Sequence, residues 1–276
     1  MKLKALIALD DNHYSDALLD FACKELDPER YMLAACFPKQ LRSDAEICIQ
    51  NFSNRGLDEL IGDLKDDVVV KQQFEKFHRK AKEKGFDHQV YYTNKFSITN
   101  LIRIASYSDL LLCGFETYAE NQEKPDSGNA IREIVKDVRS PVILIPRDYK
   151  KAKNAILSFD GKPASLHAIK QFCYTMPQWT DDNPVTVLHI DTEEHDITSC
   201  EEKILVEYLK NHCKDIAFHK VSGQPVDMLA YTLELSPQSI LVMGAFTRSM
   251  LSMVLRSSTA HELIKQRKSP LFVSNL

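Results

Sequence analysis

The sequence predicts an α/β protein made of two tandem, doubly wound domains, each with a parallel β-sheet covered by helices on both faces. Two observations lead to this fold class. Three stretches of the first half reappear in the same order in the second half, and short apolar segments of strand length alternate with amphipathic segments in both halves. Near-continuous apolar strands that alternate with helices are typical of parallel sheets buried on both faces.

The internal repeat sets the expected domain boundary. The matching pairs are ALIALDDNHYSDAL (5–18) with AILSFDGKPASLHAI (155–169), LLLCG (110–114) with ILVMG (240–244), and REIVKDVRSPVILIP (132–146) with HELIKQRKSPLFVSN (261–275). Matching residues lie about 150 positions apart at the start and about 130 at the end, so the first half carries an insertion. We therefore expect one domain at 1–148, with an insert at about 39–67, and a second domain at 149–276.

The secondary structure elements follow in the same order in both halves. Strands of the first half are expected at 3–9, 31–37, 87–92, 109–113 and 141–145. Strands of the second half are expected at 154–159, 184–190, 215–221, 239–243 and 270–274. Helices of the second half are expected from Pro163, at 197–212, after Gly223-Gln224-Pro225 and at 257–267.

The insert has no counterpart in the second half. It includes NFSNRGLDELIGDLKDD (51–67), which favours a surface helix and a loop. We expect it to form an excursion from the sheet that offers a contact surface, without a catalytic residue pattern.

Composition excludes several functional classes. With 44% hydrophobic and 27% charged residues the chain is typical of a globular protein, and its net charge of −4 predicts no binding to nucleic acid or to anionic membranes. No apolar run reaches the roughly 18 residues of a spanning helix. The seven cysteines form no CxxC pair and are odd in number, which indicates reduced thiols in a cytoplasmic protein.

The stretch MGAFTRSMLSMVLRSSTAHELI (243–264) has the layout of a phosphate site. An apolar strand leads through one glycine into a loop, and a helix then opens with hydroxyl residues whose backbone N–H groups have no partner inside the helix. Phosphate-binding loops usually contain several glycines, whereas this loop has only Gly244. Asp10, Asp160 and Gly114 are also expected at carboxyl ends of parallel strands, where such sheets bind ligands.

Three features of the second half resemble the universal stress protein family. They are the apolar strand ending in Asp and followed by Gly-x-Pro-x-Ser, the segment SGQPVDMLAYTLELSPQSILVMG (222–244), and the closing helix, Ser-Pro and strand. The resemblance covers the chain twice, so the sequence is similar to a tandem member. It implies five-stranded parallel sheets of order 3-2-1-4-5, and in nucleotide-binding members a G-x2-G-x9-G-(S/T) loop after the fourth strand. The Asp then meets the nucleoside, and the loop holds the phosphates.

This resemblance implies a degenerate site for ATP or AMP in the second half. The positions assigned to it are Asp160, Gly244, Thr247 and Ser257 in place of two glycines, Ser258 for the hydroxyl, and the neighbouring Arg248 and Thr259. Residues with a Cβ at glycine positions hinder close approach of the backbone to phosphate. The helix N-terminus, the hydroxyls and a positive charge can compensate for this hindrance.

The corresponding site in the first half is weaker. Its positions are Asp10, Gly114, Gly128 and Asn129, with Thr117 in place of the middle glycine. The loop FETYAENQEKPDSGN (115–129) is acidic, which opposes binding of a triphosphate.

Each of these residues also has a purely structural explanation. Asp160 and Asp10 can cap the helix that follows, Ser257 and Ser258 are ordinary N-cap residues, and Arg248 can be a solvated loop charge. His189, Asp191 and His195 fit no standard metal-site spacing, so no metal is expected. No nucleophile–base pair is present, so an enzyme is not predicted beyond weak ATP hydrolysis.

Two functional hypotheses remain from the sequence. The first is a stress-response binding protein whose second domain binds ATP or a related nucleotide and thereby changes the surface offered to an unknown protein partner. The alternative is a ligand-free tandem scaffold that mediates protein contacts. For both we expect an intramolecular pseudo-dimer, in which 141–146 pairs with 270–274 across a pseudo-twofold axis, and further dimerisation is compatible with either.

Overall fold

A computed structural model describes most of the chain as two compact units, Met1–Ser140 and Pro141–Leu276. The described residues are 1–9, 14–40, 48–51, 68–93, 97–115, 127–191, 197–244 and 269–275. In these residues no helix is long and apolar enough to cross a membrane.

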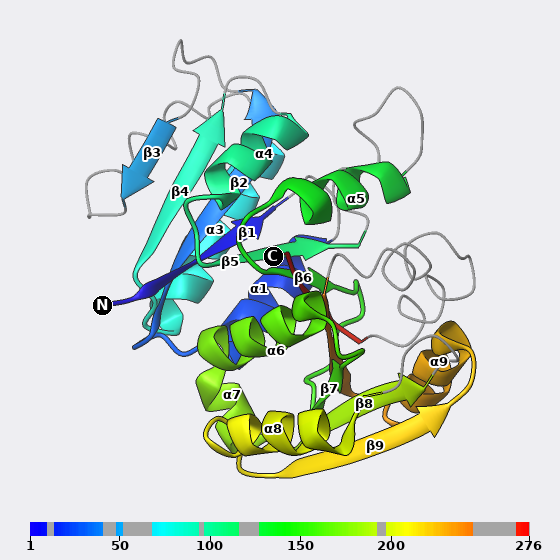
Figure 1. Cartoon of the computed structure of the whole chain (residues 1–276). Coiled ribbons are helices and arrows are strands. Elements are labelled where there is room, and N and C mark those ends of the chain that lie inside the picture. The colour runs from blue at the N-terminus through cyan, green and yellow to red at the C-terminus, as the bar shows by residue number, and fades with distance from the viewer. Residues whose placement is uncertain are drawn as a thin grey trace. The chain divides into compact units, whose positions relative to one another are not determined.

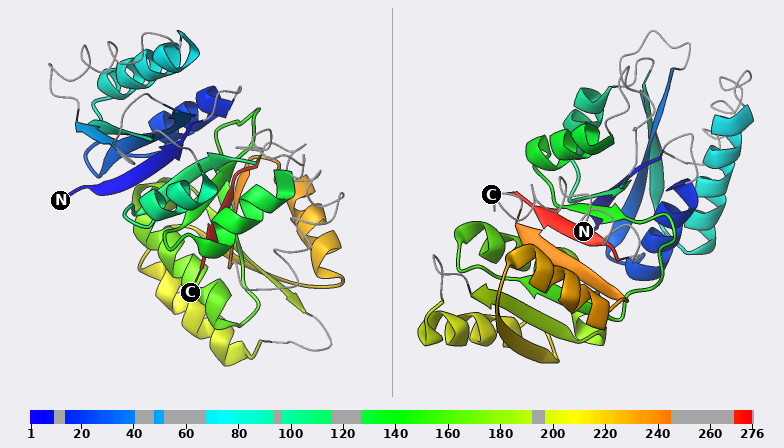
Figure 2. Two further views of the ribbon diagram at one scale, coloured as in Figure 1. Left: turned by 90° about the horizontal axis from the view of Figure 1, so that it is seen from above. Right: turned by 90° about the vertical axis from the view of Figure 1, so that its right-hand side faces the viewer.

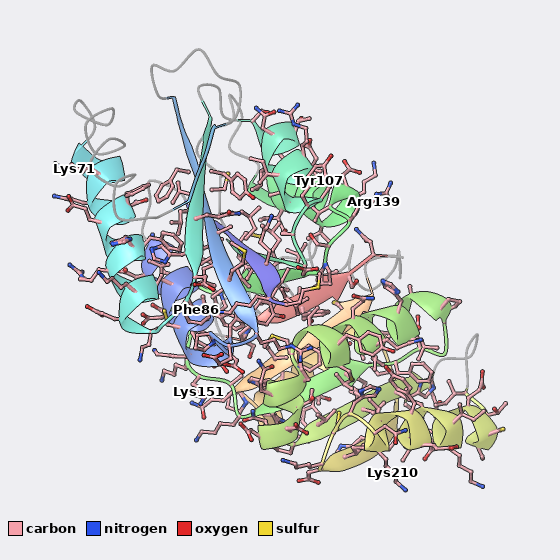
Figure 3. The ribbon with its side chains drawn as sticks, turned by 90° about the vertical axis from the view of Figure 1, so that its left-hand side faces the viewer. Lys71, Phe86, Tyr107, Arg139, Lys151 and Lys210 are labelled. Atoms are coloured by element: carbon pink, nitrogen blue, oxygen red, sulfur yellow. The ribbon has the colours of Figure 1, made fainter. Side chains whose placement is uncertain are left out.

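The first unit is a mostly parallel sheet with helices on both faces. Its elements are β1 (Leu3–Ala8), α1 (Tyr14–Glu25), β2 (Tyr31–Gln40), β3 (Cys48–Asn51), α3 (Val68–Glu83), β4 (His88–Thr93), α4 (Ile98–Ala105), β5 (Leu110–Gly114) and α5 (Ser127–Asp137). The strands lie in the order β3-β4-β2-β1-β5, and β4, β2, β1 and β5 are mutually parallel. Helices α1 and α3 pack together on one face, and α4 packs with α5 on the other (Figure 3). The right-handed crossover rule requires this division for a sheet that grows outward in both directions.

Part of the insert belongs to the sheet, and the expectation of an excursion from it is wrong for these residues. β3 pairs antiparallel with β4, from Cys48 opposite Tyr92 to Asn51 opposite Gln89. The pairing satisfies backbone groups that an outermost β4 would leave open, so the edge of the sheet is formed by the short β3, which has four residues. β2 also extends into the expected insert as far as Gln40, with a register shift after Phe37. The surface helix expected within 51–67 lies almost wholly outside the described residues, which end at Asn51 here.

The second unit contains all five strands of its repeat (Figure 1). Its elements are β6 (Val142–Ile145), β7 (Asn154–Ser158), α6 (Pro163–Thr175), α7 (Pro177–Asp182), β8 (Val185–Asp191), α8 (Ser199–Lys210), β9 (Ile216–Ser222), α9 (Pro225–Leu235), β10 (Ser239–Gly244) and β11 (Leu271–Ser274). The parallel strands run β9-β8-β7-β10-β11, which confirms the predicted order 3-2-1-4-5. β11 (red) lies beside β10 (orange) in Figure 2.

β6 and β11 pair with each other, as the sequence predicts for 141–146 and 270–274. The pairing is antiparallel, with Leu271 opposite Leu144 and Val273 opposite Val142. Because β6 makes this contact, it is grouped with the second unit, although the repeat counts it as the last strand of the first half. The compact units therefore part at Ser140, whereas the repeat places its boundary after 148.

An aromatic cluster fills the second unit between α6, α7 and β11. The ring of Phe172 packs edge-on against Phe272 at 5.2 Å and against Trp179 at 5.8 Å. All three residues are buried. α7, which begins at a proline and carries Trp179, has no counterpart in the elements expected from the sequence.

Candidate ligand site at the carboxyl ends of β7 and β10

The strand order of the second unit reverses between β7 and β10, which are neighbours in the sheet. Their register places Val242 of β10 opposite Leu157 of β7, so the two strands end beside each other. Asp160 follows the end of β7, and Gly244 is the last residue of β10. In open α/β sheets this switch point is the usual ligand position. The structure thus brings together two residues that the sequence assigns to the nucleotide site.

Asp160 is held by the turn that leads into α6. Its Oδ1 atom accepts hydrogen bonds from the backbone N–H of Lys162 at 3.1 Å and from the hydroxyl of Ser165 at 2.6 Å. Gly161, between them, has φ +76°, a conformation that favours glycine. Asp160 is not the cap of α6, because the N-cap residue is Lys162 and no side chain caps this helix. One carboxylate oxygen of Asp160 instead holds the turn before the helix through Lys162 and bonds Ser165 in its first turn.

The second carboxylate oxygen of Asp160 has a looser environment. Its nearest ionic partner among the described residues is Lys162 Nζ at 4.0 Å, and the Asp160 side chain is 27% exposed. A carboxylate oxygen accepts hydrogen bonds and donates none, so this atom suits a donor such as a sugar hydroxyl. The turn fixes the position of that acceptor before any ligand arrives.

Gly244 lies against the backbone of the first turn of α6. A Cβ atom at this position would stand 2.6 Å from the carbonyl carbon and oxygen of Ala164 and 3.0 Å from the amide nitrogen of Ser165. Only glycine fits so close an approach of strand and helix. Ser165 therefore links both residues, since its hydroxyl holds Asp160 and its backbone packs on Gly244.

His189 is fully buried at the end of β8, the strand next to β7. Its Nδ1 atom contacts the carbonyl oxygen of Phe159 at 2.8 Å. Its Nε2 atom lies 3.0 Å from Oδ1 of Asp191, at ion-pair distance but without the alignment of a hydrogen bond. Lys220 Nζ approaches the same carboxylate oxygen at 3.4 Å. These contacts hold the ends of β7, β8 and β9 together next to the site. Among the described residues, no group of three or more side chains could hold a metal ion.

The other residues that the sequence assigns to a ligand site lie either in the first unit or outside the described residues. Gly114 ends β5, and Gly128 and Asn129 lie in the first turn of α5. The candidates outside the described residues are Asp10, Thr117, His195, Thr247, Arg248, Ser257, Ser258 and Thr259.

Sequence reasoning missed Ser165 as a site residue. The signal was the Gly-x-Pro-x-Ser motif, whose last residue is Ser165. A serine three residues inside the expected helix start is well placed to bond back to a preceding Asp, as it does here. The burial of His189 has a weaker signal, because the strand pattern around it also suits an exposed strand end.

Comparison with solved structures identifies the architecture. The structure matches a universal stress protein from Archaeoglobus fulgidus DSM 4304 with a TM-score of 0.62 and 12% identity, over 99% of this chain and 96% of that chain. The chain has the universal stress protein fold. Because the match spans nearly the whole of both chains, the likeness includes both halves of the tandem.

Two further solved structures also match over nearly the whole of this chain. The cytoplasmic domain of a prokaryotic cation chloride cotransporter matches with a TM-score of 0.55 and 12% identity, over 99% of this chain and 95% of that one. A protein of unknown function from Pseudomonas aeruginosa PAO1 matches with a TM-score of 0.52 and 11% identity, over 99% and 92%. No protein-family model and no curated protein matches the sequence.

Proposed function

We propose that this chain is a stress-response binding protein whose second unit binds ATP or AMP and thereby changes the surface it offers to a protein partner in the cytoplasm. The universal stress protein fold supports the proposal, because its switch point lies where open α/β sheets bind ligands. Asp160 would meet the nucleoside there. Thr247, Arg248, Ser257, Ser258 and Thr259 would surround the phosphates.

The observation that carries the proposal is the position of the Asp160 carboxylate. Oδ1 is anchored by Lys162 and Ser165, whereas the ionic partner of Oδ2 within the described part of the chain is the Lys162 ammonium at 4.0 Å. An acceptor fixed in this way loses little conformational entropy when it binds a hydroxyl, which favours affinity. Holding the turn before α6 needs only Oδ1.

Titration calorimetry with ATP and with AMP tests the proposal on the wild type and on Asp160→Asn. The amide oxygen of the substituted side chain can still accept the bonds from Lys162 and Ser165, while an NH2 donor replaces the second oxygen. We expect the affinity to fall about tenfold, the loss of roughly one hydrogen bond to a charged group. Asp182→Asn, at an exposed position at the end of α7, is the matched control and should bind as the wild type does. Equal affinities for Asp160→Asn and wild type would remove Asp160 from the site.

The ligand-free scaffold is the second candidate, and the environment of Gly244 favours it. The contact with Ala164 requires glycine at this position without any ligand. Absence of heat with both nucleotides, together with an unchanged melting temperature at millimolar ATP, would replace the nucleotide proposal by the scaffold, because a bound ligand stabilises the folded state.

A further inference from the structure

Cys173 and Cys213 lie together in the second unit, away from the candidate ligand site. Cys173 is in the last turn of α6, and Cys213 follows the end of α8. Both are buried, with exposed fractions of 1% and 5%. They are distant in sequence, so their proximity is a product of the fold.

Two contacts beside the cysteines hold these segments in place. Thr180 of α7 donates from its hydroxyl to the carbonyl oxygen of His212 at 2.8 Å. The ring of Tyr174 packs edge-on against the ring of His212 at 5.6 Å. The neighbour of each cysteine is thus in direct contact with the neighbour of the other, which brings the two segments together.

The two thiols are within hydrogen-bonding reach of each other. The interaction with the Cys173 thiol lowers the pKa of Cys213, against the opposing effect of burial. The same interaction, with burial, raises the pKa of Cys173. One sulfur of the pair is therefore the better nucleophile, and the other holds its proton.

Cys36 and Cys113 provide an internal comparison. Both are fully buried in strands of the first unit, and burial raises the pKa of each, to about 12 for Cys36. Burial is the cause of the shift at these two thiols, whereas a neighbouring thiol lowers the pKa of Cys213. Burial by itself therefore makes a thiol inert, and the pairing distinguishes Cys213.

We propose that Cys173 and Cys213 form a peroxide-oxidisable pair that closes to an intramolecular disulfide. The Cys213 thiolate attacks one oxygen of a hydroperoxide, the O–O bond breaks, and the leaving oxygen takes up a proton. The resulting sulfenic acid on Cys213 is attacked by the Cys173 sulfur, the S–O bond breaks, and water leaves with the Cys173 proton. In total, two thiols and hydrogen peroxide give one disulfide and two waters, and two electrons pass from sulfur to peroxide.

The disulfide would join the end of α6 to the segment that follows α8 and enclose α7, β8 and α8 in its loop. A covalent link between segments far apart in sequence restricts the unfolded chain, so oxidation raises the melting temperature of the second unit. The thiols need only approach from hydrogen-bonding distance to the roughly 2.05 Å of an S–S bond. The small size of hydrogen peroxide suits the low exposure of the pair.

The test treats the full-length protein with hydrogen peroxide, blocks free thiols with an alkylating agent under denaturing conditions, and maps the peptides by mass spectrometry. A Cys200→Ser background removes the thiol that is exposed among the cysteines whose burial the structure describes, and with it the intermolecular disulfides of that thiol. We expect a Cys173–Cys213 linked peptide that disappears on reduction, while Cys36 and Cys113 remain alkylated. The oxidised protein should also melt at a higher temperature than the reduced protein.

Single variants test the order of the steps without relying on the disulfide. In Cys173→Ser the reaction should stop at a sulfenic acid on Cys213, which dimedone traps, whereas Cys213→Ser should leave Cys173 unlabelled. Peptide mapping of the Cys200→Ser protein tests the disulfide even if one of the single variants fails to fold. The proposal is overturned if Cys36 or Cys113 oxidises before the pair, or if Cys173 and Cys213 stay alkylated after peroxide has oxidised Cys200 in the wild type. Dimedone on Cys173 of Cys213→Ser at the rate seen for Cys213 would also overturn it.

Discussion

Ile143 faces Phe272 at the centre of an antiparallel strand pair, and each is the second residue of its own four-residue strand. The flanking pairs mirror each other, since Val142 lies opposite Val273 and Leu144 opposite Leu271. The register is therefore symmetric with respect to the sequence repeat. Both strands are buried and apolar, and an uncovered edge of this kind would favour aggregation. The pairing explains why the last strand of each half is a short apolar run after Ser-Pro.

Phe272 should be the most sensitive position of this strand pair. Its ring is buried against Phe172 and its backbone pairs with Ile143, so Phe272→Ala removes an aromatic side chain and leaves a cavity. We expect the free energy of unfolding to fall by about 3–5 kcal/mol in urea denaturation. Leu235→Ala, at a side chain that is 67% exposed, should change it by less than about 0.5 kcal/mol. Similar small losses in both variants would mean that β11 does not hold the core together.

Gly244 should resist substitution for a structural reason. The Cβ of Gly244→Ala would overlap the Ala164 carbonyl, and backbone atoms cannot move aside as a flexible side chain can. We expect a loss of about 1–3 kcal/mol in the free energy of unfolding without any nucleotide present. His167→Ala, at a partly exposed position of the same helix, is the control. An unchanged free energy of unfolding in Gly244→Ala would mean that β10 does not pack closely against the first turn of α6.

The strands were predictable because each is an apolar run bounded by polar or turn residues. The expected β7 at 154–159 and the observed Asn154–Ser158 differ by one residue, and the other strands of the second unit differ by as little. β3 was not predictable, since four residues in a polar insert show no run long enough to distinguish a strand from a loop. α7 was not predictable for a similar reason, because the segment Pro177–Asp182 is too short to show helical periodicity.

The candidate site was predictable in position but not in its contacts. A strand ending in Asp160 and another ending in Gly244 indicated the switch point, because parallel strands bring their carboxyl ends to one edge. The sequence could not show that both residues meet the first turn of α6, since Ser165 reaches Asp160 only through the turn at Gly161. Long-range contacts of this kind depend on the packing of helix against sheet, which periodicity does not specify.

The serines of the two Ser-Pro motifs have equivalent roles. The hydroxyl of Ser140 donates to the carbonyl oxygen of Ala105 at 2.9 Å, and that of Ser269 donates to the carbonyl oxygen of Pro237 at 3.3 Å. Each bond ties the start of a fifth strand to the segment before a fourth strand. The Ala105 oxygen also accepts hydrogen bonds from the backbone N–H and the hydroxyl of Ser108, so Ser140→Ala removes one of its bonds and should lower the free energy of unfolding by about 1 kcal/mol.

The longer bond of Ser269 predicts a smaller effect for Ser269→Ala than for Ser140→Ala. Thermal unfolding of both variants beside Ser106→Ala provides the comparison, because the hydroxyl of Ser106 donates to Ile102 at an exposed position. If the Ser106 variant loses as much stability as the two motif variants, the Ser-Pro hydroxyls have no special structural role.

The first unit should lose stability as the pH falls, because of a histidine pair between α3 and β4. His78 Nδ1 lies 2.7 Å from His88 Nε2, and His88 Nδ1 bonds the carbonyl oxygen of Phe86 at 3.0 Å. Burial lowers the pKa of both residues below the ordinary value of 6.5, and the charge of His88 lowers that of His78 further. The N–N contact needs one nitrogen without a proton, so protonation of both rings breaks it.

The lowered pKa values of His78 and His88 make the first unit less stable in acid. A histidine whose pKa is lowered by folding binds fewer protons in the folded state than in the unfolded state. Its contribution is neutral well above pH 6.5, and the folded state loses stability as the pH falls through 6.5 and down to the lowered pKa values. We therefore expect the melting temperature of the first unit to drop between about pH 7 and pH 5, and the drop to shrink in the double variant His78→Gln/His88→Gln. His219→Gln, on an exposed strand position of the second unit, should keep the full wild-type drop. A melting temperature that falls equally in the double variant and in the wild type would assign the acid sensitivity to groups other than this pair.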